Sequence, residues 1–85
     1  MKLHEAPTFL LRSLAARCAG LNGTLGDKRV ALIAVHDACH AEIARRQFEG
    51  ADFPALSPEA TAALAAQVNK GSFAEFWRLI VELEL

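Results

Sequence analysis

The sequence predicts an all-α fold, a compact four-helix domain with a long central second helix and a C-terminal helical hairpin. Alanine and leucine, which are strong helix formers, dominate the chain. Tyrosine is absent, β-branched residues are few, and no stretch keeps the alternating pattern of a strand. Glycine and proline divide the chain into four segments with apolar residues at helical spacing. The 85 residues are expected to form one domain, 1–85.

The first helix is predicted at about residues 7–19. Pro7 suits the first helical position, because its missing N–H would have no partner there. Gly20 is expected to end the helix, and a glycine-rich connector follows it. One side of this helix is apolar and the opposite side is polar. The apolar side comprises Leu10, Leu11, Leu14, Cys18 and Leu21, and the polar side comprises Arg12, Ser13 and Arg17.

The second helix is predicted at about residues 28–49, with Asp27 as its N-cap and Gly50 at its end. Its first half, "VALIAV" at 30–35, is apolar nearly all round, as is typical of a helix packed on several sides. Its second half turns polar, and Arg45 and Arg46 are expected on a solvent-exposed face. An irregular link, "ADFPAL", should follow at residues 51–56.

The third and fourth helices have clear start signals. Ser57 followed by Pro58 predicts a helix over about 58–70. Ser72 and Glu75 have the spacing of a capping box and predict a helix from residue 73. The turn between the two helices is short, so they should form a hairpin or corner. A wide apolar arc covers the last helix and comprises Phe73, Phe76, Trp77, Leu79, Ile80 and Leu83.

Net charge, the length of apolar runs and the cysteine content argue against several classes of function. The net charge of −1 gives no overall attraction to nucleic acid or anionic lipid. The longest uncharged apolar run has six residues, far below the ~20 that a membrane span needs. The N-terminal run "FLL" is too short for a signal-peptide core. Two cysteines without C-x-x-C spacing indicate free thiols, so we expect a reduced, cytoplasmic protein. We also expect no cofactor and no membrane partner.

The stretch "VHDACHAE" at 35–42 allows two interpretations. On a helix His36, Cys39 and His40 share one side, and two histidines four residues apart can chelate a metal ion. However, Asp37 is shorter than the glutamate of the zinc-protease motif H-E-x-x-H, and a structural zinc site needs four ligands. The favoured alternative places the histidines at the polar edge of the helix and Cys39 in the core.

A DNA-binding helix-turn-helix is a further alternative for the last two helices. The would-be recognition helix and its end carry Glu75, Glu82 and Glu84 against Arg78 alone. Acidic side chains are poorly suited to phosphates and to the major groove. The sequence therefore argues against nucleic acid as a partner.

The function favoured by the sequence is that of a small non-enzymatic interaction protein. Apolar residues make up 53% of the chain, which is more than so small a body is expected to hide. No catalytic constellation is recognisable. We therefore predict a homodimer, or a complex with another protein, formed through an apolar and aromatic helix surface. The predicted interface residues are Phe73, Phe76, Trp77, Ile80 and Val81.

Overall fold

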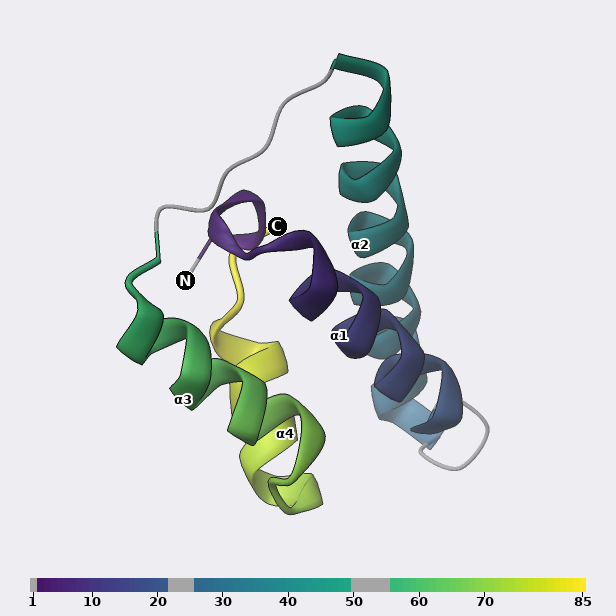
Figure 1. Ribbon diagram of the computed structural model, residues 1–85. Coiled ribbons are helices and arrows are strands. Elements are labelled where there is room, and N and C mark those ends of the chain that lie inside the picture. The colour runs from purple at the N-terminus through teal and green to yellow at the C-terminus, as the bar shows by residue number, and fades with distance from the viewer. Residues whose placement is uncertain (1, 22–25, 50–55) are drawn as a thin grey trace.

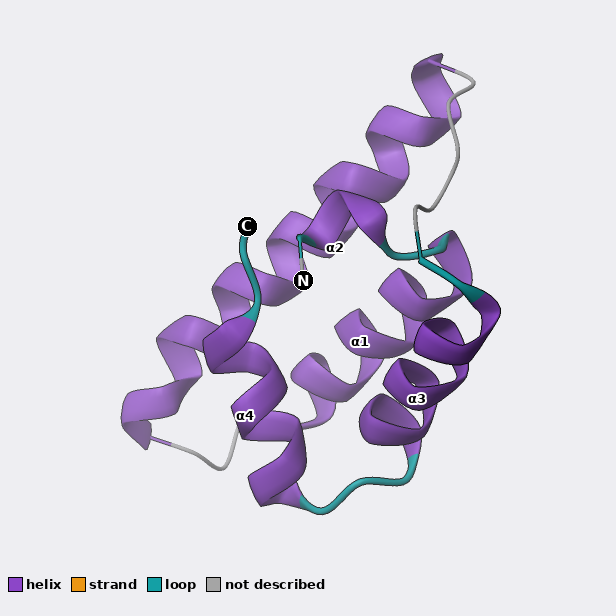
Figure 2. Ribbon diagram, turned by 90° about the vertical axis from the view of Figure 1, so that its left-hand side faces the viewer, coloured by secondary structure: helices purple, strands orange, loops and turns teal. Residues whose placement is uncertain are grey.

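The computed structural model describes residues 2–21, 26–49 and 56–85 of the chain. Within these residues the elements follow in the order η1 (Leu3–Glu5), α1 (Thr8–Leu21), η2 (Gly26–Lys28), α2 (Arg29–Glu49), α3 (Pro58–Asn69) and α4 (Phe73–Glu82), where η denotes a short 3₁₀ helix. The predicted all-α fold with four helices is confirmed. Helix α2 is the longest, with 21 residues, and packs along α1. Helix α1 lies between α2 and α3 (Figures 1 and 2).

Helix α1 begins one residue after the proline that was expected to be its first residue. The carbonyl oxygen of Pro7 accepts hydrogen bonds from the backbone N–H groups of Leu10 and Leu11, at 3.0 and 3.1 Å. The helix then continues through Gly20, so the predicted stop at this glycine is wrong. A glycine ends a helix readily when its φ is positive, and within the described residues only Gly26 has a positive φ, of 45°.

The start of α2 also differs from the prediction. Asp27 lies inside the 3₁₀ turn η2, and α2 begins at Arg29. Asp27 is therefore part of a helical turn and does not cap α2 from outside. The predicted end at Gly50 and most of the link at 51–56 lie outside the described residues.

The start signals of α3 and α4 are confirmed at the level of single hydrogen bonds. The hydroxyl oxygen of Ser57 accepts from the N–H of Ala60 at 3.1 Å. The hydroxyl oxygen of Ser72 accepts from the N–H of Glu75 at 3.3 Å. Both serines have extended backbones, as N-caps require. The short turn at residues 70–72 joins the two helices and turns the chain back (Figure 2).

One apolar cluster forms the core, and most of it comes from α1, α2 and α4. Helix α3 contributes only Val68 as a fully buried side chain, so it lies at the edge of the core. The largest fully buried side chains are Phe76, Leu10, Leu11, Leu32, Val68, Cys18 and Cys39.

The apolar first half of α2 is less enclosed than its composition suggested. Leu32 and Val35 are buried, whereas Ala34 is exposed and Val30 is 76% exposed. The expectation of packing on several sides is therefore wrong for this stretch. Helix α1 covers one side of α2, and the opposite side faces outward along much of its length (Figure 1).

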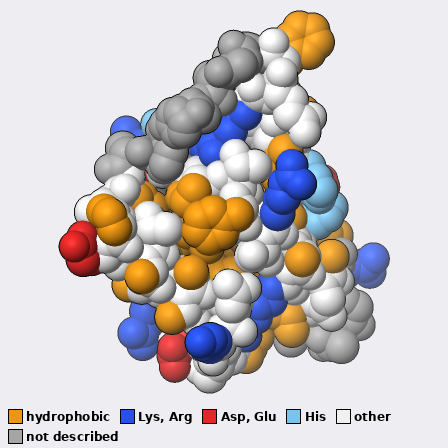
Figure 3. All heavy atoms as spheres, in the orientation of Figure 1, with side chains coloured by type: hydrophobic (Ala, Val, Ile, Leu, Met, Phe, Trp, Pro, Cys, Tyr) orange, Lys and Arg blue, Asp and Glu red, His pale blue; other side chains and the backbone are white. Residues whose placement is uncertain are grey.

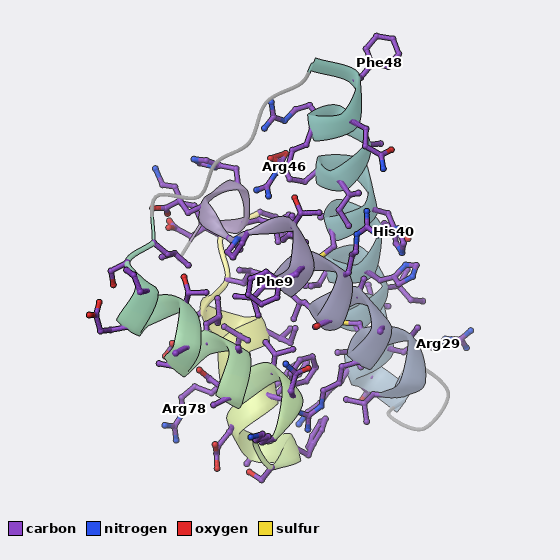
Figure 4. All side chains as sticks on the ribbon, in the orientation of Figure 1. Phe9, Arg29, His40, Arg46, Phe48 and Arg78 are labelled. Atoms are coloured by element: carbon purple, nitrogen blue, oxygen red, sulfur yellow. The ribbon has the colours of Figure 1, made fainter. Side chains whose placement is uncertain are left out.

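Two arginines that were expected on polar faces make long-range contacts. Arg46 is 6% exposed and donates to the carbonyl oxygen of His4 at 3.0 Å and to the hydroxyl oxygen of Thr8 at 3.1 Å. It also donates to the Glu42 carboxylate at 3.3 Å. Arg46 thus connects α2 to η1 and to the first turn of α1, and Figure 4 shows it pointing from α2 toward η1.

Arg17 makes the corresponding connection between α1 and the end of α3. Its guanidinium group donates to the backbone carbonyl oxygens of Val68 at 2.6 Å and Gly71 at 2.9 Å. The same group lies over the ring of Phe76, 4.5 Å from its centroid. Arg17 thereby satisfies carbonyl groups at the C-terminal end of α3, which have no partner within the helix.

The two ends of the chain meet. The backbone N–H of Leu3 donates to the carbonyl oxygen of Glu84 at 3.0 Å, in a single parallel bridge between Lys2 and Glu84. Sequence periodicity did not predict this contact, because one bridge leaves no alternating pattern. Among the described helices, none has both the length and the hydropathy needed to cross a membrane.

Candidate interaction surface

The predicted interface residues of α4 do not share one exposed face. Phe76 is fully buried and Ile80 is buried, so both belong to the domain's own core. Neither can touch a partner while the domain keeps this conformation. Val81 lies on the outer side of the helix and is 64% exposed.

Phe73 and Trp77 are half-buried and are covered by a side chain of the same molecule. Their rings stack with centroids 6.5 Å apart and planes inclined by 19°. The ammonium group of Lys28 lies over both rings, 5.1 Å from the centroid of Phe73 and 4.6 Å from that of Trp77. These cation–π contacts attach η2 to α4. The aromatic residues of α4 therefore serve contacts within the domain.

A different apolar surface is exposed between α1 and α3, and we call it the Phe9 surface. It is a shallow hollow of about 500 Å³ lined by Pro7, Phe9, Leu56, Pro58, Thr61, Ala62 and Ala65. None of these residues is charged. Phe9 is 57% exposed, and Figure 4 shows it between the two helices. In the space-filling view, apolar side chains gather at the centre of the same face (Figure 3).

A second groove, of about 320 Å³, separates α3 from α4. Its lining is mainly apolar but includes the polar side chains of Gln67 and Glu82. Leu56 borders both this groove and the Phe9 surface, so α3 forms a ridge between two hollows. The weak burial of α3 in the core is the physical reason that apolar surface remains open on both of its sides.

Phe48 and Val30 are the most exposed large apolar residues that the structure describes. Phe48 is 95% exposed and points away from the domain at the end of α2 (Figure 4). Both residues are nine positions from Cys39, which corresponds to about 180° around a helix. They therefore lie on the side of α2 opposite the buried stripe. This wheel position could have revealed them from sequence, whereas the exposure of Phe9 depends on where α3 packs.

The two histidines of α2 lie together, but Cys39 does not join them. The ring centroids of His36 and His40 are 4.5 Å apart, with the planes inclined by 59°. Nδ1 of His36 lies 3.1 Å from a carboxylate oxygen of its neighbour Asp37, a contact that helical spacing does not predict. Cys39 is fully buried, whereas His40 is exposed. Cys39 therefore lies in the core, where the favoured interpretation placed it, and is not grouped with the two imidazoles.

Both cysteines are free thiols in the core. Burial raises the pKa of the Cys39 thiol to about 12, with a smaller contribution from Cys18. Burial likewise raises the pKa of the Cys18 thiol to about 11, although Arg17 acts in the opposite direction. Thiols with such pKa values stay protonated near neutral pH and are poor metal ligands and poor nucleophiles. Among the described residues, no three His, Cys, Asp or Glu side chains are grouped to hold a metal ion.

The exposed side of α4 is poorly suited to DNA binding. Phe76, Leu79 and Ile80 face the core, which leaves Glu75, Arg78 and Glu82 among the exposed residues. Two carboxylates beside one guanidinium group repel phosphate more than they attract it. This charge distribution gives no support to the helix-turn-helix alternative.

Comparisons with protein families, with characterised proteins and with solved structures found no match.

Proposed function

We propose that this protein is a non-enzymatic interaction module that forms a homodimer through the Phe9 surface. The observation that carries the proposal is a large aromatic side chain, more than half exposed, in a surface lined only by uncharged residues. Exposed apolar surface of this kind is a common feature of protein–protein contact sites. The proposal keeps the mode of action predicted from the sequence and moves the interface from α4 to α1 and α3.

The electrostatics of the two helices favour a second copy of the chain as the occupant. A two-fold dimer places the same patch on both sides of the interface, so charged groups within the patch would face their own copies. The Phe9 surface contains no such group. Helix α1 contains arginines and no acidic residue, and α3 contains Glu59 and no basic residue. However, Arg17 is already bonded within the molecule and Arg12 lines a different hollow. The absence of charge within the patch, and not a pairing of opposite charges, therefore favours a second copy as the occupant.

The size of the surface sets the expected strength of the dimer. A standard interface buries about 800 Å² per partner, and the whole molecule exposes 5060 Å². Covering the remaining exposed part of Phe9 contributes about 1–2 kcal/mol, which alone does not offset the loss of translational and rotational freedom. We therefore expect contacts that extend along α1 and α3, and a dissociation constant on the order of micromolar or weaker.

The free thiols in the core are the basis for a proposed location. Disulfides form and persist in oxidising compartments, whereas reducing ones keep thiols free. Cys18 and Cys39 are both free. We propose a cytoplasmic protein on this ground.

Sedimentation velocity over a series of protein concentrations tests the dimer. Phe9→Ser is the test variant, and Phe48→Ser is the matched control, since it removes another exposed phenyl ring far from the surface. We expect the wild type and Phe48→Ser to shift from monomer to dimer with concentration, and Phe9→Ser to stay monomeric. A wild-type chain that stays monomeric at all concentrations would overturn the homodimer. Dissociation by Phe48→Ser and not by Phe9→Ser would show that the wrong surface was chosen.

A further inference from the structure

A further hollow, on the side of α1 that faces α2, combines a positively charged side chain with apolar ones. It measures about 360 Å³ and is lined by Arg12 from α1 and by His40, Ile43, Ala44 and Gln47 from α2. In the space-filling view a basic side chain borders the histidines (Figure 3), and Figure 4 shows His40 beside α1. We call this hollow the α1–α2 groove.

The positive charge of this groove is not neutralised by nearby acids. Neither Arg12 nor His40 makes a hydrogen bond or ion pair within residues 2–21, 26–49 and 56–85. Helix α1 has no acidic residue that could supply one. Two acids on α2 have described side chains: Asp37 contacts His36, and Glu42 is not among the residues that line the groove.

Glu42 faces away from the groove and is held by two other arginines. Its carboxylate accepts hydrogen bonds from Arg45 at 2.6 and 2.8 Å and from Arg46 at 3.3 Å. It lines a different hollow, together with His4 and Arg45. The groove therefore combines the guanidinium charge of Arg12 with the hydrogen-bonding side chains of His40 and Gln47, and no acidic residue is among those that line it.

We propose that the α1–α2 groove binds a phosphate group, either as the free ion or as a phosphate monoester. The guanidinium fork of Arg12 can donate two parallel N–H bonds to two phosphate oxygens. The imidazole of His40 and the amide of Gln47 can donate to the remaining oxygens. Ile43 and Ala44 offer an apolar floor for an organic substituent, which favours the monoester over the free ion. This site is separate from the Phe9 surface and does not require the homodimer.

Titration of the full-length chain with inorganic phosphate, followed by ¹H–¹⁵N NMR in a phosphate-free buffer, tests the proposal. A second titration with phenyl phosphate distinguishes the free ion from the monoester. We expect saturable shifts confined to amides around Arg12 and around residues 40–47, with tighter binding of phenyl phosphate. Arg12→Gln and His40→Gln should each weaken binding about fivefold. Arg78→Gln removes an exposed arginine from another face and should leave binding unchanged (Figure 4).

The outcomes separate this proposal from the homodimer. Phe9→Ser should bind phosphate as the wild type does, whatever its oligomeric state. Shifts that are spread over the chain and do not saturate would overturn the site. So would equal affinities of the wild type, Arg12→Gln and His40→Gln, provided that circular dichroism shows all three folded.

Discussion

The contrast between the neighbouring residues Arg45 and Arg46 provides a sensitive test of the structure. Arg46 is buried and donates to three acceptors, two of which belong to η1 and α1. Arg45 is exposed and its hydrogen bonds with Glu42 stay within α2. The two substitutions Arg46→Ala and Arg45→Ala therefore remove the same side chain from adjacent positions in opposite environments.

The expected magnitudes follow from the partners. Hydrogen bonds that involve a charged group contribute about 1.5–3 kcal/mol each. After Arg46→Ala, Glu42 keeps Arg45 as a partner and water can reach the vacated space, so we expect a loss of about 2–4 kcal/mol in the free energy of unfolding. Arg45→Ala should cost about 1 kcal/mol, because the Arg45 side chain is 45% exposed and Glu42, which is 10% exposed, keeps its bond with Arg46.

Urea unfolding followed by circular dichroism measures both losses in the free energy of unfolding. All variants are compared at one protein concentration, because dimer formation would add to the apparent stability. A domain of this length has a total stability of about 4–13 kcal/mol, so Arg46→Ala is expected to be folded but much weakened. Arg46→Lys keeps the charge but loses the guanidinium fork of donors, so its free energy of unfolding should lie between those of the wild type and Arg46→Ala. If Arg45→Ala and Arg46→Ala cost the same within about 0.5 kcal/mol, Arg46 is not the connection between α2 and η1 described above.

Three further predictions concern protonation, close packing and thiol chemistry. Hydrogen bonds from Arg45 and Arg46 lower the pKa of the Glu42 carboxylate from 4.5 to about 2, so its contribution to stability is complete above pH 4.5 and is lost as the pH falls toward 2. Glu42→Gln should therefore be about 1–3 kcal/mol less stable than the wild type near neutral pH, with a difference that shrinks over this acid range in urea unfolding curves. Gly71→Ala should lower the free energy of unfolding by about 1–3 kcal/mol, because the added Cβ would lie 2.6 Å from a backbone carbonyl oxygen of α3. In Gly20→Ala the added methyl group lies in open space within a helix, so this substitution should raise the melting temperature slightly. Cys18 and Cys39 should resist alkylation by iodoacetamide in the native protein and react fully in denaturant, as mass spectrometry can show, and rapid labelling of the native chain would contradict their burial.

Only some residues of the candidate sites could be predicted from the sequence. The pair His36 and His40 was identified from its spacing, since residues four apart on a helix are neighbours. The Phe9 surface was missed, because its exposure depends on where α3 packs against α1. The α1–α2 groove was missed for the same reason, since Arg12 and His40 are 28 positions apart in the chain and line one hollow only because the two helices pack together.

The sequence by itself determined the helices and the start of two of them. Helical spacing of apolar residues and the hydroxyl groups of Ser57 and Ser72 act over three or four residues, so the signal and the structure it causes lie in the same short segment. Tertiary structure alone decided which polar residues are enclosed and which apolar ones are left open. Arg46 bonds to a carbonyl 42 residues away and Arg17 to one 51 residues away. Burial at such sites depends on how distant helices pack, and no local pattern encodes that.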